Sequence, residues 1–186
     1  MKANGKIEQA LKKYRDLVAI DSKKARKCIQ QLNYQDNYYL LKCIAQTYLD
    51  ESLFEGNGNA MRKEIDFRKW RMAEKYIVQA FKINDDHAET LYTMGSIRKA
   101  GHQDDIAIYC FKRIIKLGIN RIANQEYSRG ISFAKELIND ARFELYRMYF
   151  KSDQKKSARY LEQFKANLKR GVQTIFHPLN EFLLTE

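Results

Sequence analysis

Small and apolar residues recur at an interval of 34 residues in the middle of this sequence. The two sets are Ala73, Ile77 and Ala80, then Ala107, Phe111 and Ile114. Spacings of four and three residues place each set on one face of an α-helix. Thirty-four residues is the length of one helix hairpin, and a single hairpin cannot bury its apolar face alone. The interval therefore predicts antiparallel helix hairpins that stack on one another.

The composition agrees with a fold built only from helices. The 186 residues include one proline, Pro178, and eight glycines, while Leu, Ile, Ala, Lys, Glu, Gln and Arg recur throughout. Strong helix formers with few helix breakers favour long helices over short strands and turns. A chain of this length is expected to form one domain, residues 1–186, with a substantial core. We therefore expect an all-α fold.

Apolar residues at intervals of three and four predict where the helices lie. They are expected at 6–20, 22–32, 38–50, 70–83, 88–100, 105–117, 132–150 and 155–170. Three segments interrupt this pattern. Residues 52–68 contain a Gly-Asn-Gly-Asn stretch and are expected to be an insertion within one hairpin. Residues 119–130 are expected to form an irregular connection. Residues 171–186 are expected to form a C-terminal capping helix.

The clearest hairpin resembles a tetratricopeptide repeat. Leu91, Met94 and Gly95 are similar to the first helix of that family, with a large, an apolar and a small residue, and Ala107 and Phe111 are similar to its second helix. The resemblance covers residues 38–165, with one good unit at about 88–119 and degenerate units elsewhere. It implies a short right-handed superhelix, an α-solenoid. It also implies that Gly95 lets the two helices of the hairpin approach closely.

In this family, ligands lie in a concave groove lined by the first helix of each hairpin. The resemblance carries that role to Tyr39, Lys42 and Gln46, then Tyr92, Ser96 and Lys99, then Asn139, Arg142, Tyr146 and Tyr149. Some members hold a peptide's terminal carboxylate with Lys, Arg and Asn at such places, through charge-assisted hydrogen bonds. A peptide or protein partner with an acidic face or a carboxylate is therefore implied. The alternative is that these side chains are solvated or paired locally.

The formal charge of +11 is concentrated at both ends of the chain. Residues 1–30 carry nine Lys or Arg against three acids, and residues 151–170 carry seven against two. Because phosphate contacts and exposed aromatic rings bind nucleic acid, an RNA- or DNA-binding helical repeat using its basic termini is the alternative function. Tyr160 and Phe164 lie among the basic residues, but Phe164 also fits a core stripe with Leu161 and Leu168.

Signals of catalysis or of a bound cofactor are poor. His87, His102 and His177 are isolated, no cysteine pair has metal spacing, and residues 55–63 lack the Gly-Lys-Ser/Thr of a phosphate-binding loop. We expect no catalytic residue, no metal and no cofactor.

The sequence predicts a cytoplasmic protein without a membrane span. No stretch approaches about 18 apolar residues, and Cys28, Cys43 and Cys110 fall within helical patterns, as free thiols do in a reducing compartment. The predicted function is a non-enzymatic protein-protein interaction module, in its most concrete form an immunity or chaperone-like protein with one dedicated partner. If the groove plays no part, the insertion at 52–68 is expected to carry binding.

Overall fold

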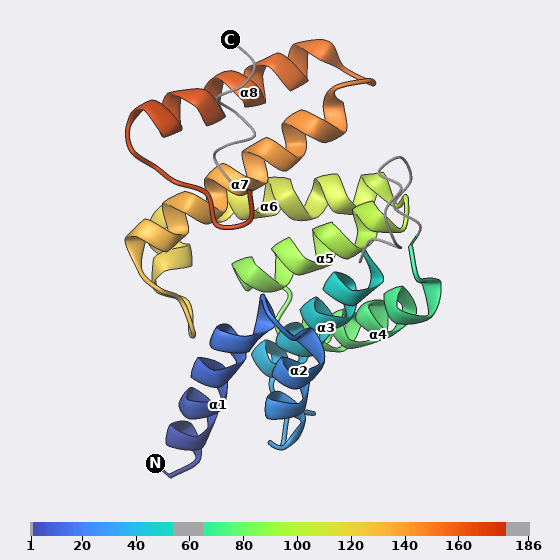
Figure 1. The fold of residues 1–186 in the computed structure, drawn as a ribbon. Helices are drawn as coiled ribbons and strands as arrows, with labels where there is room; N and C mark the ends of the chain where they lie inside the picture. The colour runs from blue at the N-terminus through green and yellow to red at the C-terminus, as the bar shows by residue number, and fades with distance from the viewer. Residues whose placement is uncertain (1, 54–64, 178–186) are drawn as a thin grey trace. The chain divides into compact units, whose positions relative to one another are not determined.

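Helices make up the regular structure of this protein. The computed structural model describes residues 2–53 and 65–177, and within these ranges it contains α-helices and no β-strand (Figure 1). The helices are α1 Lys2–Val18, α2 Ser22–Gln30, α3 Tyr38–Ser52, α4 Phe67–Ile83, α5 Ala88–Ala100, α6 Asp104–Ala123, α7 Ile131–Tyr149 and α8 Gln154–Lys169. The predicted all-α fold is confirmed. Over the same ranges, no helix is both long and apolar enough to cross a membrane.

The chain divides into two compact units, Met1–Asp86 and His87–Glu186, which we call the N-terminal and C-terminal units. In the N-terminal unit, α1 packs against α2, α2 against α3, and α3 against α4. In the C-terminal unit, each helix from α5 to α8 packs against the next, and α5 also contacts α7. The prediction that residues 1–186 form one domain stays a prediction.

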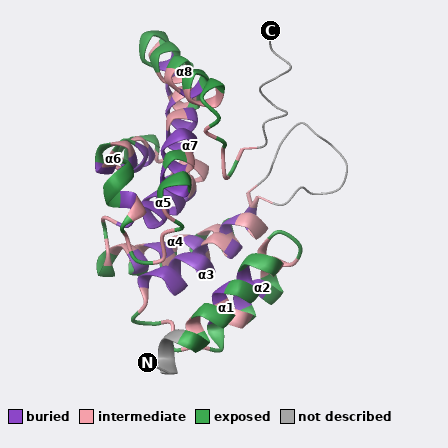
Figure 2. Ribbon diagram, turned by 90° about the vertical axis from the view of Figure 1, so that its left-hand side faces the viewer, coloured by how far each residue is buried: buried purple, intermediate pink, exposed green. Residues whose placement is uncertain are grey.

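The residues that repeat every 34 positions are core residues in both units. Ala73, Ile77 and Ala80 lie on α4, Ala107, Phe111 and Ile114 lie on α6, and all six are fully buried. Figure 2 shows that buried residues dominate α3, α5 and α7, whereas α1, α2 and α8 are exposed over much of their surface. The interval therefore marks one buried helix face in each unit, as predicted.

Gly95 lies within α5, where the ring of Phe111 occupies the space that a side chain would need. A Cβ atom on Gly95 would lie 2.9 Å from Cζ and 3.0 Å from Cε1 of Phe111. Carbon atoms in van der Waals contact lie about 3.5–4.0 Å apart. Gly95 is thus a packing glycine, and the group packed against it is the phenyl ring of Phe111, although the sequence pointed to Ala107.

Two predicted segments are corrected by the structure. Residues 119–123 are helical, because α6 resumes after a break at Gly118 (φ 77°, ψ 164°), and only 124–130 form an irregular connection. Glycine adopts this positive φ without the steric cost that a Cβ imposes. Residues 171–177 of the predicted capping helix are not helical. The rest of that cap, 178–186, and residues 54–64 of the predicted insertion lie outside the described residues.

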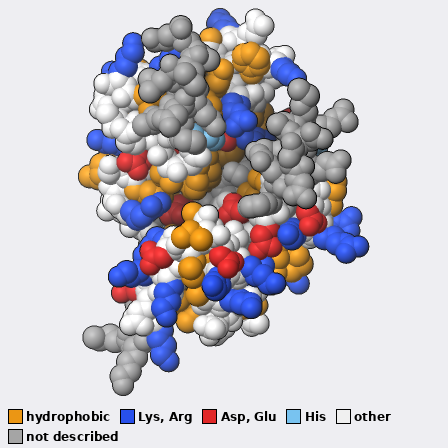
Figure 3. Space-filling view, in the orientation of Figure 1, with side chains coloured by type: hydrophobic (Ala, Val, Ile, Leu, Met, Phe, Trp, Pro, Cys, Tyr) orange, Lys and Arg blue, Asp and Glu red, His pale blue; other side chains and the backbone are white. Residues whose placement is uncertain are grey.

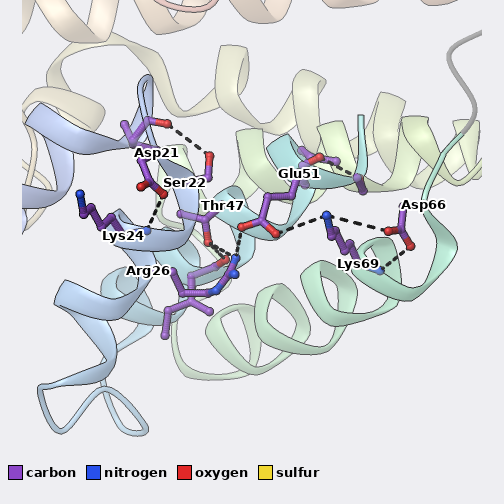
Figure 4. A network of polar contacts seen from close by, with 12 residues as sticks. Asp21, Ser22, Lys24, Arg26, Thr47, Glu51, Asp66 and Lys69 are labelled. Atoms are coloured by element: carbon purple, nitrogen blue, oxygen red, sulfur yellow. Dashed lines mark hydrogen bonds and ion pairs between the residues drawn. The ribbon is translucent and has the colours of Figure 1, made fainter. Parts of the chain in front are cut away.

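A buried arginine joins helices of the N-terminal unit (Figure 4). Arg26 on α2 forms an ion pair of 2.7 Å with Glu51 on α3, and its guanidinium carbon lies 3.9 Å from the ring centroid of Tyr48. It also donates a hydrogen bond of 3.3 Å to the hydroxyl of Thr47. Glu51 in turn pairs with Lys69 of α4 at 3.6 Å. The planar guanidinium suits this site because it both donates several hydrogen bonds and stacks on a ring.

Arg26→Met is expected to lower the free energy of unfolding by about 2 kcal/mol. The variant removes one partner of a buried ion pair, while Lys69 still pairs with Glu51 and limits the loss. Urea denaturation followed by circular dichroism measures the change. Lys24→Met, on the exposed side of the same helix, is the control and should change stability by less than about 0.5 kcal/mol. Equal losses in the two variants would show that this network contributes no stability.

Candidate functional site

One face of the C-terminal unit is covered by the segment that follows α8. The chain leaves α8 and returns to α7 (Figure 1), where residues 175–177 contact α5 and α7. We use the name α5/α7 face for the residues Tyr92, Lys99, Asp140, Phe143, Glu144 and Arg147. Four residues of this face belong to α7, and their spacing of three and four residues places them on one side of that helix.

Aromatic rings hold the side chains of the segment. The ring of Phe176 stacks on Tyr92, with centroids 4.3 Å apart and planes 15° apart. The imidazole of His177 meets the ring of Phe143 edge-on at 4.6 Å, and its Nε2 lies 3.4 Å from the hydroxyl of Tyr92. Tyr92 itself packs against the buried ring of Phe111 at 5.5 Å. Each such ring pair adds about 0.5–1.5 kcal/mol beyond the area it buries.

A buried carboxylate binds the backbone of the segment. The N–H of Ile175 donates a hydrogen bond of 2.8 Å to Oδ2 of Asp140, whose side chain is fully buried. The other oxygen, Oδ1, accepts no hydrogen bond from the described residues. Burial raises the pKa of Asp140 to about 7, against the opposing effect of hydrogen bonds from the N–H groups of Ile175 and Phe176. Residues 172–177 are not helical, and this hydrogen bond fixes their backbone against α7.

A second carboxylate on the same face lies among a lysine, a histidine and an arginine. Glu144 is buried, accepts a hydrogen bond of 2.5 Å from Lys99 Nζ, and lies 3.2 Å from His177 Nε2 and 4.0 Å from an Arg147 nitrogen. Burial alone would raise the pKa of Glu144, but the hydrogen bonds and charges of His177 and Lys99 outweigh it and lower the pKa to about 2. The α5/α7 face thus offers an aromatic surface, a carboxylate for a backbone N–H, and a carboxylate for a cationic or imidazole side chain.

Tyr92 and Lys99, both predicted from the sequence, belong to the α5/α7 face. Ser96 lies between them on α5 and is half-buried. Tyr146 borders the face through a ring contact of 5.7 Å with one of its α7 members. The ammonium of Lys99, which the resemblance assigns to a partner's carboxylate, pairs with Glu144 of this chain.

The other predicted residues of α7 lie on different sides of that helix. Asn139 accepts a hydrogen bond of 3.1 Å from Asn167 of α8, and Tyr149 stacks on Tyr160 of α8 with centroids 6.0 Å apart. Arg142 lines a cavity between α6 and α8. The structure therefore does not bring these three residues together with Tyr92.

Three of the face residues that sequence reasoning missed, Asp140, Phe143 and Arg147, each follow a chosen residue by one position. Each residue along a helix adds a rotation of about 100°, so a shift of one position selects a different side. A signal was present, because Asp140 and Glu144 are four residues apart in a helix whose neighbouring positions are apolar, and carboxylates are seldom buried unless they have partners. The sequence around Phe176 and His177 contains no comparable indication that these two residues pack against α5 and α7.

The predicted residues of α3 make local contacts within the N-terminal unit. The ammonium of Lys42 lies 4.1 Å from the ring centroid of Tyr39, and Gln46 donates a hydrogen bond of 2.7 Å to Asp50. Lys42 and Tyr39 are both buried. These contacts correspond to the alternative interpretation, in which the side chains are paired locally.

Two of the three aromatic residues on the basic helices α1 and α8 are buried. Phe164 of α8 is fully buried, whereas Tyr160 is half-buried and stacks on Tyr149. On α1, Tyr14 is buried and donates a hydrogen bond of 3.3 Å to the carbonyl of Cys43. The rings of Phe164 and Tyr14 are therefore not accessible for stacking with nucleic acid bases. On the side drawn in Figure 3, Lys and Arg side chains are interspersed with Asp and Glu.

Within residues 2–53 and 65–177, no group of three or more His, Cys, Asp or Glu side chains is arranged to hold a metal ion. Comparisons with protein-family models, with curated protein sequences and with solved structures found no match.

Proposed function

We propose that this protein is a tetratricopeptide-like α-solenoid that acts as a protein-protein interaction module, and that its α5/α7 face binds an extended segment of a partner protein. The observation that carries the proposal is the hydrogen bond of 2.8 Å from the backbone of Ile175 to Asp140, next to the stacking of Phe176 on Tyr92. Side chains on two helices thus bind a non-helical segment of this chain. One contact is to its backbone N–H and the other is to its aromatic side chain. Backbone contacts and side-chain contacts are the two sources of affinity and specificity in peptide recognition.

The chemistry of the face defines the partner's segment. Tyr92 favours an aromatic side chain, and Glu144 favours a cationic or imidazole side chain directly after it, as Phe176 and His177 provide. A carboxylate on the partner fits this face less well, because Asp140 and Glu144 are acidic and Lys99 is already paired. The partner class therefore shifts from an acidic ligand toward an aromatic-basic segment. A single dedicated partner in the cytoplasm, in an immunity or chaperone-like role, remains the concrete form of the proposal.

Residues 175–177 occupy the face in the absence of such a partner. A tethered segment acts at an effective concentration in the millimolar range. A partner must therefore displace it, and weakening the internal segment should strengthen binding in trans.

The test uses a fluorescent peptide of residues 170–177, RGVQTIFH, and the full chain carrying Phe176→Ala and His177→Ala. Fluorescence anisotropy should show that this released chain binds the peptide about tenfold or more tightly than the wild-type chain does. When Tyr92→Ala is added to the released chain, the tenfold gain in affinity for the peptide should be lost, because the ring on which the peptide's aromatic side chain stacks is removed.

Tyr109→Ala is the matched control, since Tyr109 is a tyrosine of α6 that is 58% exposed and lies outside the α5/α7 face. It should leave the affinity of the released chain unchanged. The proposal fails if the released chain binds the peptide no more tightly than the wild type, or if the two tyrosine variants weaken binding equally.

A further inference from the structure

The cavity that Arg142 lines in the C-terminal unit lies on a different side of α7 from the α5/α7 face. It has a volume of about 460 Å³ and is formed by α6, α7, α8 and the residues just after α8. Ligand pockets for small molecules have volumes of about 300–1,000 Å³. The proposed binding of a partner segment to the α5/α7 face does not involve this cavity.

The cavity is lined by cations and by no acidic side chain. Lys135 and Arg142 from α7 and Arg170 from the end of α8 all border it. None of the three forms an ion pair with a described residue. The three positive charges around this cavity repel one another, and an anion bound between them would attract all three.

Arg142 is the member of this group that is set deepest. It is half-buried, and its Nε atom is fully buried without a hydrogen-bond acceptor. Loss of solvent lowers the pKa of the Arg142 guanidinium from its usual value. Leaving a buried donor unpaired costs about 1–3 kcal/mol, and more for a charged group. An oxyanion in the cavity would supply the missing acceptor, and a guanidinium binds phosphate or carboxylate through two parallel hydrogen bonds.

Apolar side chains form the rest of the wall. Ile119 and Ile138 line the cavity together with Gly118, where α6 leaves helical geometry at φ 77°. The break in α6 sets Ile119 at the start of a new helical turn beside the cavity. The cavity therefore combines a cationic side with an apolar side, and its volume exceeds that of a phosphate group alone.

We propose that this cavity binds a small organic phosphate monoester. The phosphate lies between Arg142, Lys135 and Arg170, and the organic body packs against Ile119 and Ile138. Three cations match a dianionic phosphate better than a single carboxylate, which carries one negative charge.

Isothermal titration calorimetry of the full chain with adenosine monophosphate (AMP) tests the site, with adenosine as the uncharged probe and benzoate as the single-carboxylate probe. AMP is expected to bind at least about tenfold more tightly than adenosine or benzoate. Arg142→Gln should weaken AMP binding by about tenfold or more, and Arg170→Gln by severalfold. Circular dichroism checks that Arg142→Gln folds. If Arg142→Gln does not fold, Arg170→Gln still tests the site, because Arg170 is exposed and its substitution should not disturb the fold.

Arg159→Gln is the matched control, because Arg159 is an exposed arginine of α8 that does not line the cavity. It should leave AMP affinity unchanged. Absence of AMP binding, equal binding of adenosine, tighter binding of benzoate, or equal losses in Arg159→Gln and Arg170→Gln would each overturn the proposal.

Discussion

Gly95→Leu is expected to lower the free energy of unfolding by about 3 kcal/mol or more. A Cβ at this position would lie 2.9–3.2 Å from three atoms of the Phe111 ring. That ring is fully buried, so neither it nor the leucine can move into solvent. Inserting carbon atoms into a packed core typically costs about 1–3 kcal/mol, and leucine adds four. The gain in helix propensity over glycine, about 1 kcal/mol at most, does not offset this clash.

Urea denaturation compared with Gly5→Leu measures the effect. Gly5 lies in α1, is exposed, and has no atom within 4 Å of the position a Cβ would take. Leucine there should leave stability unchanged or raise it by up to about 1 kcal/mol. Gly95→Ala combined with Phe111→Leu should be more stable than Gly95→Leu, because the smaller side chain opposite leaves room for the Cβ. Equal stability of the two leucine variants would contradict the packing role of Gly95.

The stability of the protein is expected to fall as pH rises from about 4 to 8, and Asp140→Asn should flatten that fall. Burial also raises the pKa of Asp50 to about 6, so part of the fall below pH 7 remains in this variant. Burial raises the pKa of Asp140 from 3.8 to about 7. The unfolded chain therefore loses this proton at lower pH than the folded chain. The contribution of Asp140 to stability is complete below about pH 4 and is lost as pH rises through about 7. The slope approaches 1.4 kcal/mol per pH unit, or roughly a few kcal/mol in all.

Asparagine keeps an oxygen that accepts the N–H of Ile175 and carries no charge at any pH. Asp140→Asn should therefore be more stable than the wild type at pH 8, with a flatter profile between pH 4 and 7. Glu144 acts in a different window, since its pKa is lowered from 4.5 to about 2 and its contribution is lost as pH falls through 2.

Thermal unfolding at a series of pH values, followed by circular dichroism, measures these profiles. Asp105→Asn is the control, because Asp105 is an exposed aspartate in the first turn of α6. It should keep the slope of the wild type. Parallel profiles for Asp140→Asn and the wild type would show that Asp140 is ionised in both the folded and the unfolded chain at neutral pH.

Helix positions could be predicted from the sequence because their causes are local. Asp21, Asn37 and Asp153 each cap the helix that follows with a side-chain hydrogen bond to its first turn. Capping requires only the residue and its next few neighbours, so a short window of sequence contains the signal. The apolar spacing of α4 and α6 likewise indicated which side of each helix is buried.

The α5/α7 face could be predicted only in part. Tyr92 and Lys99 were found because α5 carries the clearest match to a repeat. On α7 the apolar spacing is broad, with residues buried on several sides, so the pattern did not indicate which side faces α5. Asn139 and Arg142, which the resemblance selected, each precede a residue of the face, Asp140 and Phe143, by one position, which on a helix is a rotation of about 100°.

The sequence by itself determined which segments form α1 to α8 and the buried role of Gly95, because each depends on residues within about one hairpin. Only the tertiary structure decided what covers the face. His177 meets Tyr92 across 85 positions of sequence, and Ile175 meets Asp140 across 35. Such contacts depend on where the whole chain returns after α8, and no local pattern records that path. The same holds for the cationic cavity, since no sequence pattern links Lys135, Arg142 and Arg170, which come together when α8 packs against α7.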